Sequence, residues 1–208
     1  MKKLIVLILC MFCASCASPG LPTSYEVMLD SSFTPDEIAV IEAGITSWYE
    51  LGPDAPSFYF EVVPTFSLPH EKDVGWSTVV IHKTTVEWVR ANGGQGNSLA
   101  LTHTCDELSN EEDDNFNMAH DAIGSTAYYP GLDNLQEFIG NNDPKTYLFE
   151  LSAHEIGHSA GLRHVNDPHK AIMNASLDDA PANGKPACDD LKQYCDIRHS
   201  ICHCANPI

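Results

Sequence analysis

Three histidines and a glutamate, all within eleven residues, limit how this chain can fold more than any other feature. His154 and His158 are four residues apart, so on a helix they lie on one face about one turn from each other. Two imidazoles in that arrangement can bind one Zn²⁺. Gly161 can adopt a positive φ, end the helix and turn the chain back, which would let His164 supply a third nitrogen. The pattern therefore predicts a helix that ends in a metal site.

The chemistry expected of such a site is hydrolysis. Three protein ligands leave the fourth position of tetrahedral zinc open for water, which is typical of catalytic zinc rather than structural zinc. Zinc lowers the pKa of that water towards neutrality, and Glu155, next in sequence to the first ligand, can take its proton as it attacks a carbonyl. A bare H-E-x-x-H recurs by chance, but five specified positions match in about one in ten thousand chains of this length.

The stretch His154–His164 resembles the H-E-x-x-H-x-x-G-x-x-H motif of metzincin zinc peptidases, and the chain is most similar to a bacterial matrixin-like catalytic domain. The segment Ala171-Ile172-Met173-Asn174 resembles the metzincin Met-turn, which in that family places a methionine beneath the metal. By matching positions, the resemblance implies that His154, His158 and His164 are zinc ligands. It also implies that Glu155 is the general base and Met173 the Met-turn residue.

The resemblance also implies an α+β, zincin-like fold. Its expected parts are a twisted mixed β-sheet, three main helices and an active-site cleft above the zinc-binding helix. In matrixin-like proteins a segment similar to residues 124–130 forms the edge strand along which substrate lies, and that position is expected here.

Residue patterns predict several elements directly. Thr34 as N-cap, Pro35 at the first helical position and apolar residues at helical spacing predict a helix that runs to Tyr49. Asp143-Pro144 should begin the motif helix, and a final helix should span about 189–199. Strands are predicted at 25–29, 57–63, 78–82 and 124–130, and 86–89 should extend the third strand or begin another.

The N-terminus has the pattern of an export signal. A basic start and a short apolar run predict a signal peptide over residues 1–16, too short to span a membrane. Residues 14–18 resemble a bacterial lipobox whose Cys16 is lipidated, and the alternative is secretion with cleavage near Ala17. Residues 17–208 should then form one catalytic domain with a cysteine-rich C-terminal end, at the outer membrane or cell surface or secreted. Only Pro19–Thr23 lie between this signal and the first predicted strand, so no propeptide is expected.

The composition is acidic, with 29 Asp and Glu against 11 Lys and Arg. This charge argues against nucleic acid or an anionic membrane as partner, so a membrane is expected only through the Cys16 anchor. The expected partner is a protein or peptide substrate, and the expected state is a monomer. The loop 105–117 contains Glu111-Glu112-Asp113-Asp114, which could bind Ca²⁺, although an acidic solvated loop is the simpler interpretation.

The cysteines of the exported chain favour disulfides, but five is an odd number, so one should be free or pair outside the chain. Cys188, Cys195 and Cys202 are seven residues apart and would share a helix face, so the helix must break or they must bond elsewhere. The alternative is a second zinc site formed by Cys195, His199, Cys202, His203 and Cys204. His120 and His169 are the other histidines considered as extra ligands.

These observations predict a zinc endopeptidase that acts outside the cytoplasm. A second hypothesis is an inactive surface binding or adhesion module with structural zinc, since a fold does not guarantee activity. A zinc hydrolase that acts on another amide is the third. The presence of Glu155 favours the enzyme, because a binding module has little use for a general base.

Overall fold

The computed structural model describes residues 22–70, 73–75, 77–93, 98–104, 124–165, 171–174, 184–198 and 200–205. They form a five-stranded sheet in the order β2-β1-β3-β5-β4. The four neighbours β2, β1, β3 and β5 are parallel, whereas β4 is antiparallel to β5 and lies at an edge. The strands are β1 (Ser24–Asp30), β2 (Ser57–Val63), β3 (Thr78–Thr84), β4 (Leu101–Thr104) and β5 (Ser125–Pro130). This mixed sheet with its helices confirms the predicted fold class.

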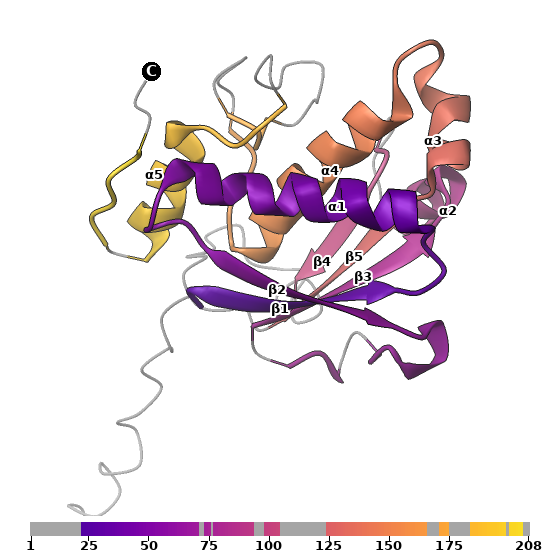
Figure 1. Cartoon of the computed structure of the whole chain (residues 1–208), viewed down its shortest axis with the longest axis horizontal. Helices are drawn as coiled ribbons and strands as arrows, with labels where there is room; N and C mark the ends of the chain where they lie inside the picture. The colour runs from indigo at the N-terminus through magenta and orange to yellow at the C-terminus, as the bar shows by residue number, and fades with distance from the viewer. Residues whose placement is uncertain are drawn as a thin grey trace, which may run out of the picture.

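In the described ranges, three helices of ten or more residues accompany the sheet: α1 (Pro35–Thr46), α4 (Pro144–Ser159) and α5 (Cys188–Ile197). The shorter elements are η1 (Ser47–Leu51), η2 (Thr65–Ser67), α2 (Val86–Ala91) and α3 (Leu132–Ile139). Figure 1 shows α1 and α4 on the same side of the sheet, with α5 and α3 towards opposite ends of α1. No helix in the described ranges is long and apolar enough to cross a membrane.

The start of α1 confirms the predicted capping pattern. The Thr34 hydroxyl accepts a hydrogen bond from Glu37 N, and the Glu37 carboxylate accepts one from Thr34 N, which together form a capping box. Pro35 occupies the first turn, where its missing N–H costs nothing. The helix ends at Thr46 and continues as the 3₁₀ turn η1, so the predicted extension to Tyr49 is helical but not α throughout.

The core lies between the sheet and the layer formed by α1 and α4. Ile41, Ile45 and Trp48 are fully buried, as their spacing predicts. Leu148 and Ile156 of α4 are equally buried. The Trp48 indole N–H donates to the Ala153 carbonyl oxygen at 3.0 Å, so this fully buried aromatic residue also fixes the motif helix against η1.

Two strand predictions are wrong. Residues 86–89 belong to helix α2, because Thr85 caps it by accepting from Trp88 N and Asn134 of α3 accepts from Val86 N. The strand at 125–130, expected at the sheet edge, is internal: β5 lies between β3 and β4. The edge is formed instead by β4, which the sequence did not predict.

The C-terminal cysteines form two disulfides, Cys188–Cys204 and Cys195–Cys202. Of the two alternatives for the seven-residue spacing, the helix break is present, since α5 ends at Ile197 and Ser200 N donates to Cys195 O. Disulfides are therefore confirmed, and the second zinc site is wrong because Cys195, Cys202 and Cys204 are all bonded to sulfur. Cys105, the signal peptide, Cys16 and the acidic loop with its calcium candidates lie outside the described residues.

The buried carboxylate of Glu37 connects α1 to α3 and β3 through hydrogen bonds. Glu37 is only 4% exposed, and it accepts from Thr34 N, from Leu132 N at the start of α3 and from the Lys83 ammonium of β3 at 2.8 Å. Burial opposes ionisation of Glu37, but these hydrogen bonds outweigh it and lower its pKa. The stabilisation is therefore present above the unfolded-state pKa and is lost as pH falls through the lower folded-state value.

Replacing Glu37 by alanine should lower the free energy of unfolding by about 3–5 kcal/mol, because it leaves Lys83 and two backbone N–H groups without their acceptor. Urea unfolding at neutral pH measures the change. Asp36→Ala is the matched control, since Asp36 is exposed and its bridge to Lys145 should contribute less than about 1 kcal/mol. Equal losses of unfolding free energy in the two variants would show that the buried hydrogen bonds of Glu37 do not stabilise the fold as described.

Candidate metal centre

Helix α4 carries the motif and begins as predicted. The Asp143 carboxylate accepts hydrogen bonds from Lys145 N and Thr146 N, both at 3.2 Å, and Pro144 follows it at the first helical position. From this start the helix runs sixteen residues and places His154, Glu155 and His158 in its last two turns.

The end of α4 turns the chain back towards the helix. Leu162 N donates to Gly157 O at 2.9 Å and Gly161 N donates to His158 O at 2.8 Å, the two bonds of a Schellman motif. Gly161 has φ +86°, which L side chains rarely adopt, so the predicted use of glycine here is confirmed. Val165 N then donates to Met173 O at 2.9 Å, so His164 is held by ordered backbone on both sides.

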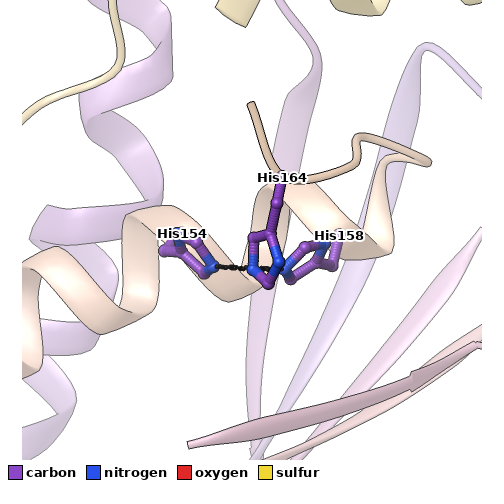
Figure 2. Close-up of side chains that lie close together, drawn as sticks. All are labelled: His154, His158 and His164. Carbon is purple, nitrogen blue, oxygen red and sulfur yellow. Dashed lines mark hydrogen bonds between the residues drawn. The ribbon is translucent and has the colours of Figure 1, made fainter. Parts of the chain in front are cut away.

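The three histidines meet at one point, as Figure 2 shows. The distance between the Nε2 atoms of His154 and His164 is 3.1 Å, that between His158 and His154 is 3.1 Å, and that between His158 and His164 is 3.2 Å. Among the described residues, this is the one group of His, Cys, Asp or Glu side chains placed to share a metal ion.

Backbone carbonyls select the tautomers of two of these rings. His154 Nδ1 is 2.7 Å from Ile172 O, and His158 Nδ1 is 2.8 Å from Leu162 O. A carbonyl oxygen only accepts, so each Nδ1 carries the proton and each Nε2 presents a lone pair. The 3.1 Å separation between the Nε2 atoms of His154 and His158 therefore brings two lone pairs together rather than a donor and an acceptor, and a cation at the centre would make it favourable.

The geometry fits zinc. Three nitrogens at about 2.0–2.1 Å from a tetrahedral ion are separated by about 3.3 Å, close to the separations in this site. Burial, followed by the charge of His158, lowers the pKa of His154 to about 3, and the same causes lower that of His164. The lowered pKa values favour neutral imidazoles, which is the form that binds metal.

Glu155 lies beside this group but is not one of its members. It is 7% exposed, and its Oε2 accepts a hydrogen bond from the Thr102 hydroxyl of β4 at 2.7 Å. A carboxylate held near a metal without binding it is positioned to exchange a proton with a water there.

The segment Ala171–Asn174 packs under the histidines. Met173 is fully buried, and its Sδ lies so close to Gly157 that a Cβ at that glycine would collide with it. The Ile172 carbonyl accepts from His154, so this turn contacts a candidate ligand directly. Met173 therefore packs against the motif helix at Gly157, and its neighbour Ile172 contacts His154.

The Asp190 carboxylate of α5 accepts hydrogen bonds from the backbone of the Ala171–Asn174 turn. It is 1% exposed and accepts from Ile172 N at 2.9 Å, Met173 N at 3.2 Å and Ala187 N at 2.8 Å. Burial raises the pKa of its carboxyl, and the three N–H groups oppose that rise. The carboxylate thus connects α5 to the turn and, through Ile172, to His154.

The structure therefore brings together all five residues predicted from the motif and the Met-turn. His120, His169 and His199 lie outside the described residues. Sequence reasoning missed three contributors, Thr102, Gly157 and Asp190. Asp190 was identifiable only as an acidic residue in the first turn of a helix, and nothing in the local sequence marks Thr102 as a neighbour of Glu155.

The family that the chain matches agrees with this geometry. Residues 80–197, more than half of the chain, match the model of the peptidase family described as Matrixin. No curated protein matches the chain. Among solved structures, the chain is similar to high choriolytic enzyme 1, a hatching enzyme zinc-protease from the medaka fish Oryzias latipes. That match has 8% identity and a TM-score of 0.43, and covers 86% of this chain and 90% of the other.

Proposed function

Because the chain belongs to the matrixin family of zinc metallopeptidases, we propose that it is a zinc-dependent endopeptidase that hydrolyses peptide bonds in extracytoplasmic proteins. In this proposal His154, His158 and His164 bind the zinc, Glu155 is the general base, and Met173 is the Met-turn residue. The observation that carries it is the convergence of three Nε2 atoms within 3.1–3.2 Å beside a buried, non-ligand carboxylate.

Zinc in this site would activate a water molecule and polarise the carbonyl of the peptide bond. The chain supplies the proton transfers: Glu155 accepts a proton from the attacking water and can return it to the nitrogen of the leaving amine. His154 and His158 keep their Nε2 lone pairs turned to the centre because Ile172 and Leu162 hold the opposite nitrogens.

The edge strand supports a protein substrate. Among the described residues β4 pairs with β5 alone, so we propose that its other side offers backbone N–H and C=O groups to an extended peptide. Thr102 of this strand touches Glu155, so a peptide paired with β4 would pass close to the general base. An extended polypeptide therefore fits the surroundings of the site better than a compact small amide.

We also propose an extracytoplasmic location, which rests on the sequence of residues 1–18. The basic and apolar start resembles an export signal, and Cys16 stands where a lipobox places its lipidated cysteine. The two disulfides of the C-terminal region suit an oxidising compartment.

Metal removal tests the proposed activity. The purified protein should contain one zinc per chain and cleave an unstructured protein such as casein. Chelation should reduce cleavage to background, because the three histidines would no longer hold the ion that activates the water. One equivalent of zinc should restore cleavage. Cleavage that persists in fully chelated protein, or a well-folded preparation without zinc, would overturn the proposal.

A further inference from the structure

We propose that Thr102 is a positioning residue for catalysis: its hydroxyl orients the Glu155 carboxylate so that one oxygen faces the water to be deprotonated. This inference rests on the proposed function, and it assigns a role in the reaction to a residue outside the zinc-binding motif.

The side chain of Thr102 points towards the motif helix. In the sheet, Thr102 is paired with Ala127 of β5, which is paired in turn with Ile81 of β3. Residues in register share a face of the sheet, and Ala127 and Ile81 are both fully buried in the core. A threonine at this core-facing position is polar where an apolar residue would be expected, so its hydroxyl requires a partner.

Glu155 is that partner. The Thr102 Oγ1–H donates to Glu155 Oε2 at 2.7 Å, while the Glu155 backbone oxygen, 3.5 Å away, is too distant to compete. Within the part of the chain that the structure describes, no other side chain donates to this carboxylate. Because Glu155 is 7% exposed, the bond is shielded from water and should be strong for a hydroxyl–carboxylate pair.

The bond distinguishes the two carboxylate oxygens. Oε2 is occupied by the hydroxyl, which leaves Oε1 as the oxygen that can accept the proton. The χ1 of threonine is stiff because the residue is β-branched, and β4 is fixed by its pairing with β5. The carboxylate is therefore held in one orientation, and losing such a support usually costs about 10- to 100-fold in activity.

The alternative is that the bond only satisfies a buried hydroxyl. Thr102→Val removes the hydroxyl at nearly constant volume, and Thr102→Ser keeps it. For a positioning role, T102V should lower kcat on casein by about 10- to 100-fold with KM changed less than about twofold, and one zinc per chain should remain. T102S should restore kcat to within about threefold of wild type.

Thr126→Val is the matched control. Thr126 lies next to Ala127 on the opposite face of β5, is 1% exposed, and its hydroxyl has no hydrogen-bond partner among the described residues. T126V thus makes the same chemical change one strand away without reaching Glu155. Its kcat should equal that of wild type, and its melting temperature should stay equal or rise.

A crystal structure of T102V supplies a readout that does not depend on activity. The Glu155 carboxylate should leave the orientation it has in wild type or occupy more than one rotamer. If wild type cleaves casein and T102V matches its kcat, the inference is wrong while the proposed function stands. If wild type does not cleave, the proposed function fails, and an unchanged Glu155 in crystalline T102V would overturn the inference as well.

Discussion

Glu155→Gln should lower kcat for casein cleavage by about 10²–10⁴-fold while the protein keeps one zinc per chain. Glutamine has nearly the shape of glutamate, but its amide cannot accept a proton from water at neutral pH. Metal binding should survive because the three ligands are histidines, and Glu155 is not a member of the group that could hold the ion. Zinc analysis and initial cleavage rates on wild type and variant, side by side, measure both quantities.

Glu137→Gln is the matched control, since it makes the same change of charge at an exposed position of α3. It should cleave casein at the wild-type rate. An E155Q protein that cleaves as fast as wild type would remove Glu155 from the reaction. Zinc in both proteins with cleavage by neither would favour the non-enzymatic binding module over the peptidase.

Elements defined by local signals were predictable from the sequence. The cap of α1 depends on Thr34, Pro35 and Glu37, which are within four residues of one another. The start of α4 depends on Asp143 and Pro144 in the same way. The strand at 57–63 was predicted with its observed bounds, because it is a run of β-branched and aromatic residues flanked by turn residues.

Elements that depend on distant partners were not predictable. Residues 86–91 contain β-branched residues that favour a strand, but their first N–H groups bond to Thr85 and to Asn134 of α3, and the segment is helical. The position of β5 inside the sheet depends on pairing with β4, a strand of only four residues that gives no periodic signal.

The candidate site likewise contains residues that local sequence predicts and residues that it does not. Its ligands and base lie within eleven residues on one helix and its turn, so helix geometry alone indicates that they meet. The groups that orient them come from other elements: Thr102 is 53 residues from Glu155 and Asp190 is 18 residues from Ile172. Such contacts form only when the sheet and α5 are packed, so the local sequence does not contain them.

Asp190→Ala should have the largest effect among these supporting residues. Its removal leaves three backbone N–H groups, at Ile172, Met173 and Ala187, without their acceptor in a buried region. We expect the free energy of unfolding to fall by about 3–5 kcal/mol, as for other buried charges whose removal breaks a network. Urea unfolding of the metal-free protein measures this loss.

The same variant should weaken zinc binding by about 10- to 100-fold, because Ile172 also holds the Nδ1–H of His154 and loses its own support. Competition with a chromophoric chelator gives the affinity. Asp189→Ala removes an equal charge at an exposed neighbouring position, so its stability and zinc affinity should match wild type. If D190A loses stability but binds zinc as tightly as D189A, then Asp190 supports α5 alone and His154 is oriented independently of the turn.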